Sequence, residues 1–310
     1  MSVICKIDGK EFKDEKSLHL ALRSYGLNKE KYYHKYFPRK DLLTGEIINF
    51  KTKDQYFNSD FNDKNNMKIW LKQQTEQTAQ EYCRKILNRR KEGKNIIYSP
   101  SQVELRSIMS PSIIFYNKIF NDYYDLCESI GLKNKFIHPK NIKVQFKNKL
   151  KSEDVIYIDT REQNWLKFNS KFEIKTLTYG DYACSLNNNC YVERKSLSDF
   201  ISTLSSNNIE RFNNEIFKAK INNSYLVVIV EEKMANALSF KYLPHINKKI
   251  KATPEFIFHN LRELMQKYEN LQFLFVDGRN EMKRVIEAIF ASENFYKEVD
   301  LQLAYDLKLL

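Results

Sequence analysis

Three short apolar runs in the second half of the chain constrain its fold more than any other feature. VIYID, YLVVIV and LQFLFV, at residues 155–159, 225–230 and 271–276, each have the length of a buried strand. Stretches with apolar residues at helical spacing lie between and after them, including a helix expected from about residue 280 to 291. Strands that alternate with helices predict an α/β domain with a mixed central sheet, which we place at residues 153–296.

Positive charge is concentrated in the first half of the chain. Residues 1–150 hold 29 Lys and Arg against 17 Asp and Glu, whereas residues 151–310 hold 22 of each, so the net charge of +12 belongs to the first 150 residues. A basic region beside a neutral domain is typical of a module that binds a polyanion such as DNA. Solvated lysine surfaces without such a role are the alternative that charge alone leaves open.

Cysteine usage and hydropathy indicate the compartment. The five cysteines include no CxxC pair, and an odd number of thiols is more typical of a reducing cytosol than of a disulfide scaffold. No apolar run approaches the roughly 18–20 residues of a membrane span. We therefore expect a cytoplasmic protein without membrane contacts, and the lysine- and asparagine-rich composition favours an AT-rich bacterial or viral genome.

The first half has a more helical and fragmented pattern than the second. Ser-Pro-Ser and Asn-Asp sequences start short helices there, and glycines end them. We expect a mainly helical, basic N-terminal region that precedes the α/β domain. It begins with a small α/β or finger-like segment at 1–60 and a basic helix and linker at 61–95, followed by a helix-turn-helix-like repeat at 96–135 and a linker at 136–152. After the α/β domain we expect a C-terminal tail at 297–310. The basic helix ends in cations that we expect to bind DNA: Arg84, Lys85, Arg89 and Arg90.

The stretch GDYACSLNNNCYVERKSLSDF, residues 180–200, predicts a hairpin that gathers charged groups. Asparagines tolerate left-handed turn geometry, and a turn centred on Asn187 places Asp181 opposite Glu193. Like charges at that spacing are destabilising unless a cation lies between them, and Lys195 projects from the same face as Glu193. Two carboxylates and an ammonium suit phosphodiester hydrolysis with Mg²⁺, whereas no His or Cys cluster is present for zinc. A plain polar hairpin with a Glu193–Lys195 salt bridge is the alternative.

Three blocks of residues carry a resemblance to a known family. Asp159-Thr160-Arg161-Glu162, Gly180-Asp181-Tyr182 and Glu193-Arg194-Lys195, with Asp199 four residues on, resemble the DxRE, GDY and ERKxxxD pattern of the XPF-type (ERCC4-domain) endonucleases, in that order. The stretch from Asn208 to Phe212 also resembles the arginine-containing helix start that follows in the family. The resemblance covers about residues 153–295.

This resemblance implies a restriction-endonuclease-like fold of the PD-(D/E)XK type that cuts DNA with Mg²⁺ or Mn²⁺. By matching position, the expected metal ligands are Asp159, Asp181 and Glu193. The other matched residues are expected around them: Lys195 as the catalytic lysine, Asp199 as its support, Glu162 beside the ligands, and Arg161, Arg194 and Arg211 on phosphates or carboxylates. Nuclease domains of this family commonly pair with a like domain, so a homodimer is expected as well.

The chain departs from the family after the nuclease domain. About 15–20 residues remain after residue 292, fewer than the tandem helix-hairpin-helix motifs of many members need. The basic first half is therefore the expected DNA-binding part. Within it, residues 99–132 resemble the short helical repeats appended to homing endonucleases, in which a helix can enter the major groove. The expected polar contacts of that helix include Ser112, Tyr116, Asn117 and Lys118.

These observations favour a metal-dependent DNA endonuclease that its basic N-terminal half directs to particular sites, as in homing enzymes. A structure-specific endonuclease for flaps, forks or junctions is the first alternative, and a catalytically silent DNA-binding scaffold is the second.

Residues 4–37 have the outline of a zinc-finger-like segment, but Asp8 stands where a second cysteine after Cys5 is needed, so we expect no zinc. The residues alone do not separate DNA from RNA as the substrate.

Overall fold

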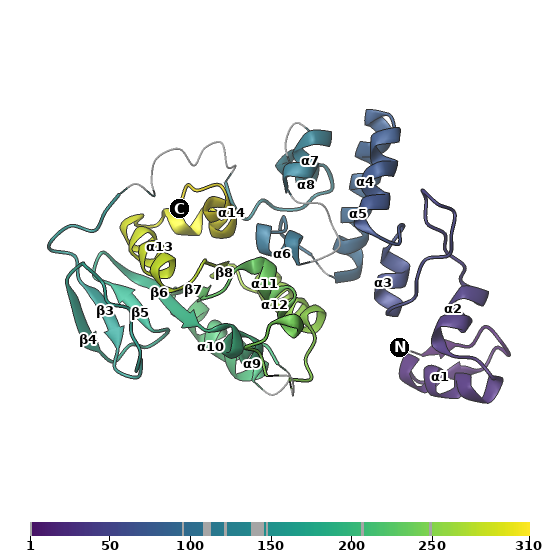
Figure 1. Ribbon diagram of the computed structural model, residues 1–310, viewed down its shortest axis with the longest axis horizontal. Coiled ribbons are helices and arrows are strands. Elements are labelled where there is room, and N and C mark those ends of the chain that lie inside the picture. The colour runs from purple at the N-terminus through teal and green to yellow at the C-terminus, as the bar shows by residue number, and fades with distance from the viewer. Residues whose placement is uncertain are drawn as a thin grey trace. The chain divides into compact units, whose positions relative to one another are not determined.

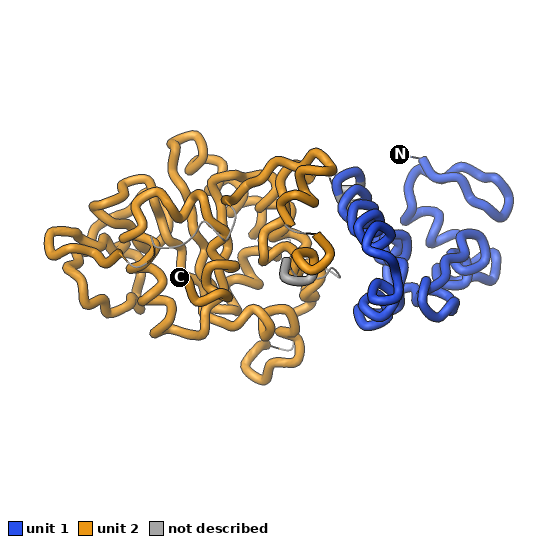
Figure 2. The backbone as a smooth tube through the Cα atoms, turned by 90° about the horizontal axis from the view of Figure 1, so that it is seen from above, with its two compact units in different colours: residues 1–93 blue, residues 94–310 orange. Residues whose placement is uncertain are grey.

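A computed structural model describes residues 2–94, 96–107, 113–120, 123–137, 146, 148–205, 208–247 and 250–310. The chain divides into two units, residues 1–93 and residues 94–310, which Figure 2 distinguishes by colour. Each unit is described by itself below. Within the described part of the chain, no helix has both the length and the apolar character needed to cross a membrane.

The first unit combines a small sheet with short helices. Its elements are the antiparallel strands β1 (Val3–Ile4) and β2 (Glu11–Phe12) and the helices α1 (Glu15–Ala21), η1 (Leu22–Tyr25), α2 (Lys29–Tyr36), α3 (Lys53–Asn58), α4 (Lys64–Gln73) and α5 (Glu76–Lys94) (Figure 1). Four helices begin at a side chain that accepts a backbone N–H of the first turn: Asp14, Asn28, Thr52 and Asp63. Leucines and the buried Tyr32, Tyr33 and Tyr56 form the core beneath α1, α2 and α3.

A buried carboxylate ties the first unit together. Asp60 is 8% exposed and accepts hydrogen bonds from Arg39, Arg89 and Tyr82, a group that we call the Asp60 cluster. Arg39 Nη2 lies 2.5 Å and Arg89 Nη1 lies 2.6 Å from its two oxygens, and the Tyr82 hydroxyl is 3.1 Å away. Because Arg39 follows α2 and Arg89 belongs to α5, the Asp60 cluster joins the early and late parts of the unit.

A six-stranded mixed sheet forms the centre of the second unit. Its order is β4-β3-β5-β6-β7-β8, and the strands are β3 (Ile156–Asp159), β4 (Phe172–Lys175), β5 (Tyr182–Cys184), β6 (Asn187–Lys195), β7 (Tyr225–Val230) and β8 (Leu271–Phe275). β5 is antiparallel to both β3 and β6, whereas the pairs β3–β4, β6–β7 and β7–β8 are parallel. The three apolar runs form β3, β7 and β8, which confirms the predicted mixed sheet.

Helices cover both faces of this sheet (Figure 1). One core cluster includes residues of α9 (Leu197–Thr203), α10 (Ile209–Ile221), α11 (Met234–Ala237), η4 (Phe240–Tyr242) and α12 (Pro254–Lys267), and the other includes α13 (Arg279–Ala291), η5 (Phe295–Lys297) and α14 (Leu301–Asp306). Along β7, Val227 and Ile229 belong to one cluster, and Val228 and Val230 to the other. Both faces of β7 are therefore buried, as its unbroken apolar run predicts.

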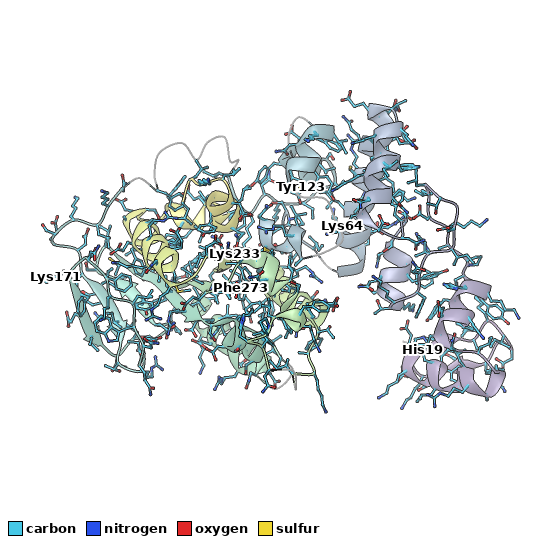
Figure 3. The ribbon with its side chains drawn as sticks, viewed as in Figure 1. His19, Lys64, Tyr123, Lys171, Lys233 and Phe273 are labelled. Atoms are coloured by element: carbon cyan, nitrogen blue, oxygen red, sulfur yellow. The ribbon has the colours of Figure 1, made fainter. Side chains whose placement is uncertain are left out.

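Three short helices precede the sheet in the same unit: α6 (Gln102–Arg106), α7 (Ile113–Ile119) and α8 (Tyr123–Ser129). In the capping box that opens α6, the side chains of Ser101 and Glu104 accept each other's backbone N–H. Val103 belongs to the core cluster of α12 and is buried, as are Tyr123 of α8 and Phe273 of β8, which Figure 3 labels. Gln102 N–H donates to Asp300 at 2.6 Å, and Arg106 pairs with Asp306 at 2.7 Å. Helix α6 is therefore built into the domain that contains the sheet.

Lys135 fixes the chain after α8 to the end of α12. Its ammonium donates to the main-chain carbonyls of Met265, Tyr268 and Leu271, at 3.0, 3.2 and 3.3 Å. The carbonyls of Met265 and Tyr268 lie where α12 ends, so the lysine satisfies acceptors that the helix leaves without partners, and Leu271 begins β8. Burial lowers the pKa of Lys135 to about 8.

The turn between β5 and β6 differs from the prediction. Ser185 and Leu186 form a two-residue turn, whereas the three asparagines from Asn187 onward begin β6. Tyr182 pairs with Val192, but Cys184 pairs with Asn187, because the register shifts between Ala183 and Cys184. This bulge moves the turn without changing the pairing at the other end of the hairpin.

Residues 297–310 also differ from the expected tail. Val299, Leu301, Ala304 and Leu310 are at most 4% exposed and belong to the core cluster of α13. Their apolar side chains complete one face of the sheet. The expected linker at 136–152 lies largely outside the described residues, although Phe146 belongs to the same cluster.

Candidate active site

Two neighbouring strands bring the predicted acidic residues together. Asp181 directly precedes β5, and Glu193 and Lys195 lie on β6. The pairing of Tyr182 with Val192 sets Asp181 beside Glu193, the register that the sequence predicts. Asp181 Oδ2 accepts the backbone N–H of Arg194 at 2.7 Å, which holds the carboxylate against β6.

Gly180 permits this close approach of the two strands. Its φ is +60°, and a Cβ at this position would lie 2.8 Å from the carbonyl oxygen of Val192. Any side chain would therefore both strain the backbone and push β6 away. The glycine of the GDY block thus places Asp181.

Negative charge exceeds positive charge at this point. Burial, followed by the neighbouring Glu193, raises the pKa of Asp181 to about 7. Lys195 is 9% exposed, and its ammonium donates to Glu193 Oε1 at 2.7 Å and lies 5.7 Å from the centroid of the Phe212 ring. Two carboxylates therefore share one ammonium, so a further cation would stabilise the site.

The pair formed by Asp181 and Glu193 suits a hard divalent cation. Mg²⁺ is commonly held by one or two carboxylates and keeps positions for water and substrate phosphate. A cation would favour the ionised form of Asp181, which its surroundings otherwise disfavour. Within the described ranges, no group of three Asp, Glu, His or Cys side chains is arranged to hold a metal. The donor set therefore fits Mg²⁺ or Mn²⁺ bound partly by water and substrate.

Asp159, the third expected ligand, is already engaged. Its Oδ1 accepts Arg161 Nε at 2.6 Å and the Arg161 backbone N–H at 2.8 Å, and its Oδ2 accepts the Leu177 N–H at 2.7 Å. Burial opposes ionisation, but the hydrogen bonds from Arg161 and Leu177 outweigh it and lower the pKa of Asp159. Asp159 therefore fixes the end of β3 to the chain after β4, because its oxygens bond the protein's own donors.

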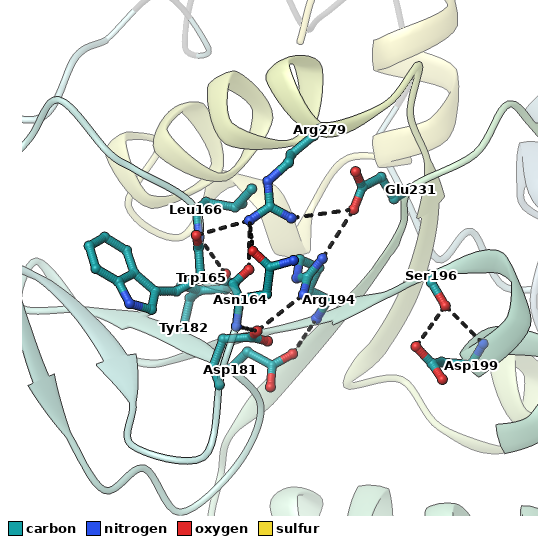
Figure 4. A network of polar contacts seen from close by, with 11 residues as sticks. Asn164, Trp165, Leu166, Asp181, Tyr182, Arg194, Ser196, Asp199, Glu231 and Arg279 are labelled. Carbon is teal, nitrogen blue, oxygen red and sulfur yellow. Dashed lines mark hydrogen bonds and ion pairs between the residues drawn. The ribbon is translucent and has the colours of Figure 1, made fainter.

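Arg194 links two acidic residues at the ends of different strands (Figure 4). Its guanidinium donates to Glu162, which follows β3, and to Glu231, which follows β7, at 3.1 Å in each case. Arg279, the first residue of α13, lies 4.0 Å from Glu231 and donates to the carbonyls of Asn164 and Trp165. Of the two roles expected for Arg194, phosphate contact or support of carboxylates, the geometry provides the second.

Asp199 and Arg211 lie at the starts of helices beside the site. Asp199 Oδ2 accepts the Ser196 hydroxyl at 2.6 Å, and its backbone N–H donates to Ser196 Oγ at 3.1 Å, so the bonds of Asp199 cap α9 rather than support Lys195. Arg211 is exposed in the first turn of α10. Its side chain is accessible to a ligand.

Two acidic residues at the site were not predicted from the sequence. Glu231 follows β7, the parallel neighbour of β6, and a carboxylate after a buried strand is a recognisable signal. Glu215 lies on α10 one helical turn after Arg211, and Glu193 and Lys195 are among the charges that act on it. The spacing of Arg211 and Glu215 places both on one helix face, but only the fold shows what that face meets.

The cations expected to bind DNA lie on α5 in different settings. Lys85 is exposed, Arg84 is half-buried, and Arg89 is held in the Asp60 cluster. Arg90 belongs to the same helix, but its side chain lies outside what the structure describes. Of these expected DNA contacts, Lys85 is therefore exposed to solvent, whereas Arg89 bonds a carboxylate of its own unit.

The residues of α7 that were expected to contact DNA also differ in their exposure to solvent. Tyr116 is fully buried, with its ring 5.3 Å from that of Tyr123, so it is a core residue and differs from the expected surface contact. Asn117 and Lys118 are exposed, although Asn117 Oδ1 accepts the Tyr123 backbone N–H at 2.8 Å. Ser112 lies outside the described residues.

Part of the second unit matches a known protein family. Residues 158–289 match the model of the ERCC4 domain family. A solved structure of XPF from Aeropyrum pernix in complex with DNA shares 19% identity over 44% of this chain and 62% of that chain, with a TM-score of 0.34. A second structure of XPF from Aeropyrum pernix shares 17% identity over 50% of this chain and 68% of that chain, with a TM-score of 0.33.

The matched part of the chain spans less than two thirds of the DNA-bound Aeropyrum pernix structure. No curated protein matches the chain. The family match and the mixed sheet together confirm the restriction-endonuclease-like α/β fold that the sequence predicts.

Proposed function

Because residues 158–289 match the ERCC4 domain family, we propose that this chain is a DNA endonuclease that hydrolyses phosphodiester bonds with Mg²⁺ or Mn²⁺. One observation carries the proposal: Asp181 and Glu193 lie side by side, with Lys195 bonded to Glu193 at 2.7 Å. The alternative of a plain polar hairpin does not explain why two carboxylates are packed together at the carboxyl end of β6. Asp181 and Glu193 would hold the cation.

The cation and the side chains of the protein would have different roles in the hydrolysis. When bound, the cation would polarise the scissile phosphate and lower the pKa of a water nucleophile. Lys195 would orient that water and stabilise the additional negative charge as the phosphorus–oxygen bond breaks. Arg194, through Glu162 and Glu231, would keep β6 and the chain after β3 in position as the phosphate enters.

The test is cleavage of a set of DNA substrates by the full chain, with Mg²⁺ or with EDTA. Supercoiled plasmid, linear duplex, a 3′ flap, a splayed fork and single strands would be compared. Glu193→Ala should lose cleavage and keep DNA binding, and Glu210→Gln, an exposed charge change on α10, should keep both. Tight binding without cleavage on every substrate would instead favour the silent scaffold. An RNA oligonucleotide in the same assay would separate RNA from DNA as the substrate.

For targeting, we propose that the basic first unit holds the DNA, as its excess of Lys and Arg supports. Cleavage of the plasmid at discrete sites would support a homing-like, site-directed enzyme. The second candidate is a structure-specific endonuclease for flaps, forks or junctions. It is favoured by the packing of α6 and Tyr116 into the second unit, which leaves fewer side chains of residues 96–135 free to read bases. Cleavage of branched substrates alone would support it.

The homodimer stays a prediction of the resemblance. Sedimentation of the full chain, alone and with DNA, would test it. A monomer that cuts DNA would contradict the expectation while leaving the proposed activity intact.

A further inference from the structure

Helix α10 lies along the site and presents a charged face to it. The Phe212 ring, near the start of α10, lies 5.7 Å from Lys195 Nζ. Glu215 follows three residues later, which places it next to Phe212 on the helix surface. The Glu215 carboxylate is half-buried, and the charged groups that act on it are Glu193, Lys195, Arg211 and Arg161.

This carboxylate has no partner among the residues that the structure describes. It accepts no hydrogen bond and forms no ion pair there, although Arg211 lies one turn away on the same helix. Burial, followed by the repulsion of Glu193, raises the pKa of Glu215. A half-buried carboxylate with unused acceptor oxygens is available to accept hydrogen bonds from donors that enter the site.

A hydrated cation would supply such donors. Mg²⁺ and Mn²⁺ sites that use two protein carboxylates keep several waters, and each water must donate hydrogen bonds to an acceptor nearby. Lys195 already bonds Glu193 Oε1, and Arg194 N–H bonds Asp181 Oδ2, so the two ligands have few oxygens left for this purpose. Glu215 is the neighbouring carboxylate with both oxygens available.

We propose that Glu215 is a positioning residue of the cation site, which accepts hydrogen bonds from waters of a divalent cation held by Asp181 and Glu193. The inference rests on the proposed function, because it needs the same cation. It assigns α10 a role in metal affinity in addition to its packing on the sheet. Glu215 is not one of the residues in the DxRE, GDY and ERK blocks.

The experiment is Mn²⁺ binding to the full chain without DNA, measured by the loss of the free-ion EPR signal. Glu215→Gln keeps the shape of the side chain and removes the charge. We expect it to raise the Kd for Mn²⁺ by about 10–100-fold, the usual effect of removing a group that supports metal ligands. Glu215→Ala should act in the same direction. Glu210→Gln, an exposed position on the same helix, is the matched control and should bind as the unaltered chain does.

The outcomes separate the two proposals. Weaker Mn²⁺ binding by both Glu215 variants, at a melting temperature in EDTA no lower than that of the unaltered chain, supports the inference. Unchanged binding in Glu215→Gln, while Glu193→Gln loses it, overturns the role of Glu215 and leaves the proposed cation site standing. If the unaltered chain binds no Mn²⁺, or Glu193→Gln binds normally, the proposed site fails and the inference fails with it.

Discussion

A buried carboxylate in the first unit and a half-buried one in the second show opposite arrangements of charge. Asp60 in the first unit is surrounded by two guanidiniums and a tyrosine hydroxyl, all within 3.2 Å. Asp181 in the second unit receives one backbone N–H at 2.7 Å and lies beside another carboxylate, Glu193. A carboxylate whose oxygens all have partners holds a structure together, whereas one with an excess of negative charge around it is prepared for a cation.

Loss of Lys195 should give the largest effect on function. Lys195→Ala removes the positive charge beside Glu193, and we expect cleavage to slow by about 10²–10³-fold, because stabilisation of the transition-state charge is lost. Asp60→Ala should leave the cleavage rate per folded molecule nearly unchanged. The measurement is single-turnover cleavage of the best substrate at saturating protein. Equal losses in the two variants would remove the distinction between the two carboxylate settings.

Loss of Asp60 should give the largest effect on stability. Asp60→Ala leaves Arg39 and Arg89, each 23% exposed, without their partner, and we expect the unfolding free energy of the first unit to fall by about 2–4 kcal/mol. Urea denaturation followed by tyrosine fluorescence measures the change. Asp8→Ala, which removes a more exposed carboxylate of the same unit, serves as the control. A change of similar size in both variants would mean that the Asp60 cluster has no special role.

Neutralising Asp181 should instead stabilise the protein, in a pH-dependent way. Its folded pKa is raised to about 7 from the usual 3.8, so the folded state holds the proton more tightly and stability falls as the pH rises between these values. Asp181→Asn removes this loss. In EDTA, we expect its melting temperature to exceed that of the unaltered chain by about 5 °C at pH 8, with little difference at about pH 4. A lower melting temperature at pH 8 would contradict the charge imbalance.

Two neighbouring cations of α5 should give the smallest effects and complete the comparison. Lys85 is exposed, so Lys85→Ala should weaken DNA binding a few-fold and reduce the slope of log Kd against log salt by about one, without changing stability. Arg89→Ala should mainly lower stability, because Arg89 belongs to the Asp60 cluster. Fluorescence anisotropy at several salt concentrations, together with thermal melting, checks both. A normal slope in Lys85→Ala would place the DNA contact elsewhere.

The sequence predicts the parts of the fold that depend on local pattern. The apolar runs become β3, β7 and β8, and the register that brings Asp181 to Glu193 follows from the spacing of the GDY and ERK blocks. The position of the turn was not predictable, because a bulge near Cys184 moves it to Ser185 and Leu186. Spacing cannot reveal such a shift, since a bulge leaves residues of one strand unpaired while the rest of the register is kept.

The roles of individual site residues depend on contacts that are distant in sequence. Asp159 and Asp181 belong to equally clear motifs, yet the oxygens of Asp159 bond Arg161 and Leu177. Tyr116 has the spacing of a surface contact, but its neighbours bury it. Glu215 stands outside every motif and is found only because α10 lies next to β6. Motifs therefore located the site, and packing decided which side chains can act in it.

The bonds of Lys135 have a consequence for the order in which the second unit folds. Its three acceptor carbonyls come 130, 133 and 136 residues later in the chain. At the usual speed of protein synthesis they leave the ribosome on the order of ten seconds after the lysine does. Until then α6 lacks the helices against which it packs, and the Lys135 ammonium lacks its acceptors. Helix α6 and Lys135 therefore make their final contacts only when the last third of the unit has been synthesised.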